Sequence, residues 1–175
     1  SWMLMRNIFE HYGEEYSSEF INTISRLGIE VVTRYGFSVN IGDMDLEKET
    51  IEGIQNTIRD AERQIAKLIA DYQQGLLKPL PGRSEAETLE VYILDVLNNA
   101  RNKCGTVAMS EKRDTTTLMM ARSGSRGNVL NIAQMTAIVG QQAMRGKRIE
   151  NGFQQRALSY FKRRDLGPQA RGFIK

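Results

Sequence analysis

The chain has 175 residues, of which 41% are apolar and 26% charged, so its composition excludes wholesale disorder and fits one ordinary domain or two small ones. A single cysteine, Cys104, and a single histidine, His11, exclude a disulfide framework and zinc sites made from these residue types, and disfavour a histidine-dependent catalytic triad. No apolar run reaches the roughly 18–20 residues of a membrane span, no signal peptide is visible, and few runs resemble strands, so we expect a mostly helical cytoplasmic protein with no membrane partner.

The formal net charge is +3, but the charge is distributed unevenly along the chain. Residues 145–175 carry a charge of +7, and residues 1–144 carry a charge of −4. A basic end on an acidic body suggests a polyanion nearby, either nucleic acid or nucleotide phosphate. A basic surface that packs against an acidic partner subunit explains the same distribution, so the charge alone leaves both alternatives open.

The N-terminal part contains two candidate helices and a candidate strand. Residues 3–12 predict a short helix that ends at Gly13, and a second helix is expected from about residue 18 to 35, ending before Gly36. Residues 37–41 (FSVNI) alternate between apolar and polar side chains, which predicts a short strand.

The strongest pattern predicts a long antiparallel helical hairpin. Apolar residues recur three and four positions apart over a first helix at about residues 46–74. These residues are Ile51, Ile54, Ile58, Ala61, Ile65, Leu68 and Tyr72. The turn at 78–82 (KPLPG) forces the chain to double back, and Ser84 with Glu87 forms a capping box that starts the second helix. We expect this second helix to end at Gly105.

The remainder of the chain is less regular. Asp114 is a candidate N-cap of a short helix, and Asn128 is a candidate N-cap of another helix at 129–144. Beyond it the helical period disappears, and the tail is too irregular to form a core of its own. The predicted fold is therefore mainly α: a long antiparallel helical hairpin plus shorter helices, with a few short strands near 37–41 and in the C-terminal tail.

Two polar features in this part suggest contacts with other molecules. The glycine-rich run at 123–127 (SGSRG) before a helix N-terminus is typical of an anion site, to which Arg126 would add a charged fork, but it also fits a simple connection between helices. Gln134 and Gln141 share one helix face with Asn131. Such a polar face either lines a wet channel, contacts polar partners, or is merely solvated.

Several segments together carry a specific signature. They are residues 122–128 (RSGSRGN), 130–135 (LNIAQM) and 139–149 (VGQQAMRGKRI), flanked by 36–43 (GFSVNIGD), 97–103 (LNNARNK) and 152–173. This set resembles the funnel region of the largest subunit of multisubunit DNA-directed RNA polymerases. The Met-Arg-Gly form at 144–146 and the lack of eukaryote-like insertions are similar to the archaeal, A-prime type.

The resemblance implies a domain organisation. Residues 1–45 would be the C-terminal part of the pore domain, 46–149 the funnel domain, and 150–175 the lead toward the bridge helix. The large apolar side chains at Trp2–Met5 are unusual for a terminus, so we expect the chain to be a fragment of a longer one.

The resemblance also implies a function. The fragment would line the secondary channel through which nucleotides enter and backtracked RNA leaves, and on whose rim transcript-cleavage factors dock. Its partners would be other polymerase subunits, a cleavage factor, nucleoside triphosphates and the RNA 3′ end in transit, and the DNA held by the full enzyme. The full enzyme is a nucleotidyltransferase with Mg²⁺ bound elsewhere, and the fragment, which lacks that metal site, would bind no cofactor and be inactive alone.

By position, the resemblance places one set of residues on the channel wall: Asn98, Arg101, Leu130, Gln134, Gln141, Gln142, Gly146, Lys147 and Arg148. Arg126 of the glycine-rich run and Asn131 of the polar helix face complete the set of candidate channel-wall or binding residues. The segment at 156–161 (RALSYF) departs from the family's usual RTLPHF, so Tyr160 stands where the family has histidine.

An alternative function does not require the chain to be part of a polymerase. A free-standing helical module that binds nucleic acid or a partner protein through its basic C-terminal tail would explain the charge distribution equally well. If it contacted several phosphates, its affinity would fall by roughly a decade or more for a modest rise in salt.

Overall fold

The computed structural model describes residues 2–111 and 115–175, and confirms a mainly α fold within them. The chain divides into two compact units, the first ending at Val39 and the second beginning at Asn40. The elements are α1 (Trp2–Tyr35) in the first unit, and η1 (Ile41–Met44), α2 (Lys48–Gln73), α3 (Glu85–Ser110), α4 (Thr116–Ser123), α5 (Val129–Thr136), β1 (Gly140–Gln141), β2 (Ala143–Met144), β3 (Lys147–Arg148), η2 (Gln169–Arg171) and β4 (Phe173–Ile174) in the second.

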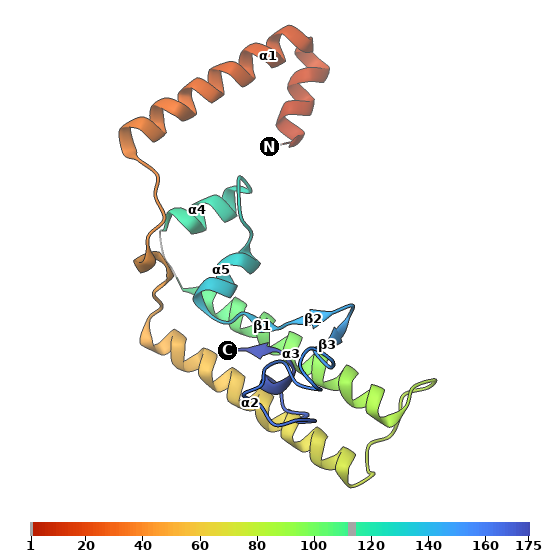
Figure 1. Ribbon diagram of the computed structural model, residues 1–175. Helices are drawn as coiled ribbons and strands as arrows, with labels where there is room; N and C mark the ends of the chain where they lie inside the picture. Colours follow the sequence, from red (N-terminus) through yellow and green to blue (C-terminus); the bar gives the residue numbers. More distant parts are fainter. Residues whose placement is uncertain (1, 112–114) are drawn as a thin grey trace. The chain divides into compact units, whose positions relative to one another are not determined.

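The first unit is α1, which consists of two helical segments joined by a kink at Gly13. Gly13 has non-helical backbone angles, φ 82° and ψ −174°, so the first segment ends there, as predicted. The second segment starts directly after the kink, earlier than the expected start at about residue 18, and runs to Tyr35 (Figure 1). Gly36, with φ 70°, does end α1, as predicted.

The predicted strand at 37–41 is wrong. Residues 36–40 have no regular structure, and the chain then forms the 3₁₀ helix η1. Asn40 caps this helix: its side chain accepts a hydrogen bond from the Asp43 backbone N–H, and the Asp43 carboxylate accepts one from the Asn40 N–H. This local capping box satisfies backbone groups that a strand would have left for a neighbouring strand.

The second unit is built on the predicted antiparallel hairpin of α2 and α3 (Figure 1). The capping box at Ser84 and Glu87 starts α3, as predicted. The core of this unit contains the buried seam residues of α2 and the buried stripe of α3. Its buried members from these two helices include Ile54, Ile58, Ile65, Leu89, Ile93, Leu97 and Cys104.

Two helix ends differ from expectation. Gly105 does not end α3, which continues to Ser110. At this position α3 and α5 pack closely, since a Cβ on Gly105 would lie 3.2 Å from the Cβ of Ala133 in α5. Helix α5 begins at the predicted cap, Asn128, but ends at Thr136 instead of Met144. The chain leaves it for β1, where Gly140 has φ 85°.

The short helix α4 is capped by Thr115, whose hydroxyl accepts a hydrogen bond from the Leu118 N–H. The predicted cap, Asp114, lies outside the described residues.

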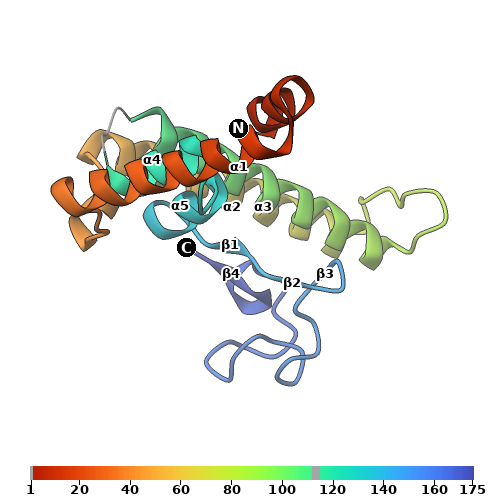
Figure 2. The ribbon, with the colours of Figure 1, turned by 90° about the horizontal axis from the view of Figure 1, so that it is seen from above.

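The strands are short and lie with the C-terminal loops on one side of the helical hairpin (Figures 1 and 2). Strand β1 pairs antiparallel with β4, which confirms a strand in the tail, and β2 pairs antiparallel with β3. The β2–β3 turn consists of Arg145 and Gly146, with φ values of 53° and 77°, as a tight hairpin of primed type requires. The tail forms no core of its own; Phe173 instead joins the α2–α3 core.

In the part of the chain that the structure describes, no helix combines the length and apolar character needed to cross a membrane.

Candidate functional site

A cavity of about 790 Å³ lies where the β2–β3 hairpin and the C-terminal tail meet the first half of α3. Helix α3 contributes Glu87 and Glu90, and the hairpin contributes its tip, Arg145–Lys147, together with Arg148. Leu166 and Arg171 of the tail complete the wall beside Glu90. The cavity therefore brings the hairpin and the tail, which are 18 residues apart at Arg148 and Leu166, against α3. Arg148 and Arg171 are 58 and 81 residues away from Glu90 in the chain.

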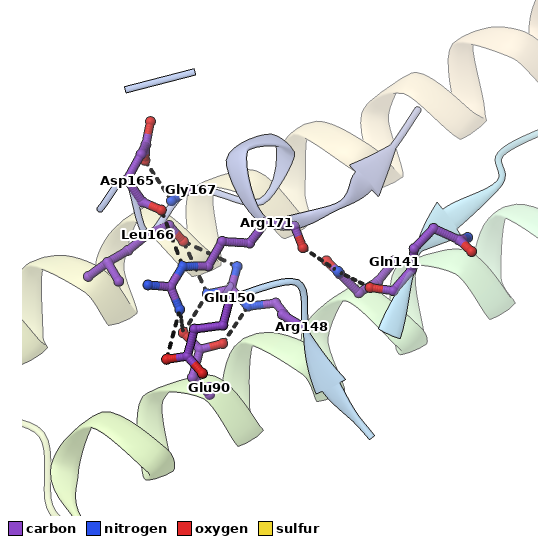
Figure 3. Close-up of polar contacts among 9 residues, drawn as sticks. Glu90, Gln141, Arg148, Glu150, Asp165, Leu166, Gly167 and Arg171 are labelled. Carbon is purple, nitrogen blue, oxygen red and sulfur yellow. Dashed lines mark hydrogen bonds and ion pairs between the residues drawn. The ribbon is translucent and has the colours of Figure 1, made fainter. Parts of the chain in front are cut away.

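Glu90 is the centre of the polar contacts around this cavity (Figure 3). Its Oε2 accepts a hydrogen bond from Arg148 Nε at 2.7 Å, and its Oε1 accepts one from Arg148 Nη2 at 2.8 Å. The same Oε1 also accepts a hydrogen bond from Arg171 Nη1 at 2.9 Å. One carboxylate thus holds two guanidinium groups, one of them through a bidentate fork.

The two arginines are buried, and their other donors are used as well. The side chain of Arg148 is 0% exposed and that of Arg171 9%, whereas Glu90 is 25% exposed. Both terminal nitrogens of Arg148 donate to the Leu166 carbonyl at 3.2 Å, and Arg171 Nε donates to the Asp165 carbonyl at 3.3 Å. Buried charges of this kind persist only when they are paired and hydrogen-bonded.

Gln141 connects β1 to the tail. Its side-chain amide donates to the carbonyls of Gln142 and Arg171, at 2.7 and 2.8 Å. The neighbouring residue must be glycine, because a Cβ at Gly140 would lie 2.8 Å from Cδ of Arg101. Gln141 therefore fastens β1 to the tail, whereas Gly140 lets β1 approach Arg101 of α3 closely.

Electrostatics at the edge of the cavity favour an ionised carboxylate at Glu87. The hydrogen bonds from the backbone N–H and then the hydroxyl of Ser84 lower the pKa of Glu87, and the positive charges of Lys147 and Arg83 lower it further. Elsewhere in α3, burial raises the pKa of the Cys104 thiol, so this side chain is kept neutral.

The structure separates the predicted channel-wall residues into groups. Gly146, Lys147 and Arg148 come together at the cavity, and Arg101 and Leu130 line a separate groove of about 470 Å³ between α3 and α5. Arg126, Leu130, Asn131, Gln142, Gly146 and Lys147 are exposed; Asn98, Arg101 and Gln134 are half-buried; Gln141 and Arg148 are buried. That these positions line a channel stays a prediction, and Arg148 and Gln141 have packing roles within the chain in any case.

Two residues that organise the site were missed in the sequence, Glu90 and Arg171. Glu90 directly follows the buried Leu89 and lies one turn before the buried Ile93, so it flanks the apolar stripe of α3. A carboxylate beside a buried stripe, in a chain with a surplus of basic residues near its C-terminus, was a usable signal for a buried ion pair. Nothing in the sequence indicated which of the nine basic residues of the tail would reach it.

No group of three or more histidine, cysteine, aspartate or glutamate side chains suited to a metal occurs among residues 2–111 and 115–175. The prediction that this chain binds no metal or other cofactor is not tested by that observation and stays a prediction.

Comparison with known proteins agrees with the resemblance found in the sequence. The family described as RNA polymerase Rpb1, domain 4 matches residues 69–174. The DNA-directed RNA polymerase subunit Rpo1N of Thermococcus celer is 42% identical over 176 residues, covering 98% of this chain and 19% of that protein. Subunit Rpo1N of Methanothermobacter thermautotrophicus (strain Delta H) is 39% identical over 173 residues, covering 98% of this chain and 20% of that protein.

The Rpo1N protein of Halococcus morrhuae is 38% identical over 98% of this chain, which covers 50% of that protein. The chain thus spans about a fifth of the length of the Thermococcus and Methanothermobacter relatives. The matches run across both units of the structure and include the hairpin, the cavity and the tail. On this evidence, the chain belongs to the family of RNA polymerase Rpb1, domain 4.

Proposed function

We propose that this chain is part of the largest subunit of an archaeal-type DNA-directed RNA polymerase, and that it lines the secondary channel of that enzyme. The observation that carries the proposal is the 42% identity to an Rpo1N subunit over 98% of the chain. In this role the chain shapes a passage for nucleotides and for backtracked RNA, and carries out no bond chemistry itself. The catalytic Mg²⁺ would be bound elsewhere in the enzyme.

The surface of α1 supports a place inside a larger assembly. Among the described residues of this helix only Ser17 is buried. Large apolar side chains remain exposed along its whole length: Trp2, Met3, Leu4, Phe9, Tyr12, Tyr16, Ile21, Ile24, Leu27, Ile29, Val31, Val32 and Tyr35. A helix that is apolar on several faces is stable in water only when other surfaces cover it. We expect the remainder of the polymerase to supply these surfaces.

The exposed cations of the β2–β3 hairpin support a passage for polyphosphates. Arg145 and Lys147 are both exposed, and both line the 790 Å³ cavity. Positive charge at the edge of a solvent-filled passage raises the local concentration of anions. Lys147 is a better probe than its neighbour Arg148, because Lys147 is exposed whereas Arg148 is buried in an ion pair.

A free-standing module that binds nucleic acid through residues 145–175 is the weaker hypothesis. Three of the nine basic side chains of this segment, Arg148, Arg171 and Lys175, are ion-paired to α3 or α2, and Lys175 Nζ lies 2.6 Å from Glu62 Oε1. Ion pairs within the chain therefore occupy a third of these cations. A surface that binds nucleic acid needs its cations available for phosphates.

Substitution of Lys147 in the complete enzyme tests the proposal. In a reconstituted archaeal polymerase that carries this chain, Lys147→Gln should raise the apparent KM for nucleotides or slow cleavage of backtracked RNA. Lys162→Gln, which removes an exposed lysine of the tail, is the matched control and should change neither. Wild-type nucleotide dependence and cleavage in the Lys147 variant would contradict the channel-wall role.

A further inference from the structure

We propose that Glu90 is a positioning residue, through which α3 sets the place of the hairpin tip Arg145–Lys147 and couples it to the C-terminal tail. Its carboxylate acts through the guanidinium groups of Arg148 and Arg171. The consequence for nucleotide passage rests on the proposed function, whereas the coupling itself does not.

The hairpin depends on Arg148 for its attachment to α3. Strands β2 and β3 have only two residues each, and a two-stranded hairpin of this length is marginal by itself in water. Ala143, Met144 and Lys147 are exposed, and Arg148 is the buried residue of the four strand positions. The bidentate contact of Arg148 with Glu90 therefore supplies the main fixed point of the hairpin (Figure 3).

The same carboxylate also holds the tail. Glu90 Oε1 accepts hydrogen bonds from both Arg148 and Arg171, so the two segments share one oxygen atom. The backbone joins them on either side of this point: Gln142 N–H donates to the Gly172 carbonyl at 2.9 Å, and Ile149 N–H donates to the Arg171 carbonyl at 3.3 Å. Loss of the carboxylate charge would leave two buried guanidinium groups without their main counter-charge, and would release both segments together.

Other charged groups near the arginines do not replace Glu90. Glu150 Oε1 is 3.9 Å from Arg171 Nη1, and the Glu150 side chain is 53% exposed. At that distance and exposure the attraction is screened by water. The Leu166 and Asp165 carbonyls that face the two arginines carry no net charge.

Hydrogen exchange in the assembled enzyme tests the coupling. Glu90→Gln keeps the shape of the side chain and removes its charge, so opening at 141–149 and 169–174 should increase on the order of 100-fold, with 54–65 of α2 unchanged. Glu62→Gln is the matched control, because Glu62 pairs with Lys175 of the tail through side chains that are 34% and 42% exposed. It should change exchange less than about fivefold. Unchanged exchange in the Glu90 variant would overturn the proposal.

Arg148→Lys gives an independent measurement if the Glu90 variant does not assemble. Lysine keeps the charge but cannot form the bidentate contact, so exchange should increase at 141–149 and much less at 169–174, where Arg171 still meets Glu90. Equal protection of the hairpin in this variant and in the wild type would overturn the role of the Arg148 contact.

The apparent KM for nucleotides distinguishes positioning of the hairpin tip by Glu90 from a general effect of Glu90 on stability. If Glu90 acts through the hairpin tip, Glu90→Gln and Lys147→Gln should each raise the apparent KM, and the double variant should equal the larger single effect. Multiplying effects would overturn positioning of the tip by Glu90. If exchange increases as expected while neither variant changes KM or cleavage, the coupling stands and the proposed channel role falls.

Discussion

Two glycines on facing helices are expected to respond differently to the same substitution by alanine. Gly53 in α2 and Gly105 in α3 both lie inside helices, where replacement by alanine gains about 1 kcal/mol of helix propensity. A Cβ at Gly53 would lie 3.6 Å from Val107 Cγ1, an ordinary contact. A Cβ at Gly105 would lie 3.2 Å from the Ala133 Cβ, so α5 would have to shift.

Gly53→Ala should therefore stabilise the second unit by about 1 kcal/mol. Gly105→Ala should show no net gain, because strain at the contact between α3 and α5 offsets the gain in propensity, and Gly105→Leu should destabilise by about 1–3 kcal/mol. Urea unfolding followed by far-UV circular dichroism measures these differences as shifts in midpoint at constant slope. A gain at Gly105→Ala equal to that at Gly53→Ala would refute the claim that this glycine exists for close packing.

Three further predictions concern titration, reactivity and context. Because hydrogen bonds from Ser84 lower the pKa of Glu87, its stabilising contribution is present above the ordinary glutamate pKa and lost as pH falls through the lowered value. Glu87→Gln should therefore reduce the urea midpoint at pH 7, and this reduction should shrink as the pH is lowered; a reduction independent of pH would contradict this. Because burial raises the pKa of Cys104, iodoacetamide should label it at pH 7.5 only after unfolding, and labelling of the native protein detected by mass spectrometry would show that the site opens. An antibody to this chain should detect, in source cells, a band much larger than the chain that copurifies with RNA polymerase activity; a free band of the size of the chain, separate from polymerase, would favour the independent module.

The helical hairpin and the N-caps of α3 and α5 could be predicted because their causes are local. The three- and four-residue spacing of the apolar residues in α2, the capping box at Ser84 and the cap at Asn128 depend on neighbours within one or two turns. The strand at 37–41 failed for a related reason: alternation over five residues is a weak signal, and the Asn40–Asp43 capping box favoured a 3₁₀ turn.

Other features depended on contacts between distant segments. Gly105 resembles a helix end in the sequence, and only the approach of Ala133 explains why it lies inside α3. The early end of α5 likewise follows from the pairing of β1 with β4, about 33 residues further along the chain.

The candidate site likewise combines features that the sequence indicates with features that depend on distant contacts. The family signature, the hairpin and the surplus of positive charge near the C-terminus can all be recognised in the amino-acid sequence. That Arg148 and Arg171 face inward to Glu90 while Lys147 stays exposed depends on the packing of distant segments. The reason is physical: adjacent strand residues point to opposite faces, so which of two neighbouring cations is buried depends on the surface that the hairpin meets, and that surface is 58 residues away in the chain.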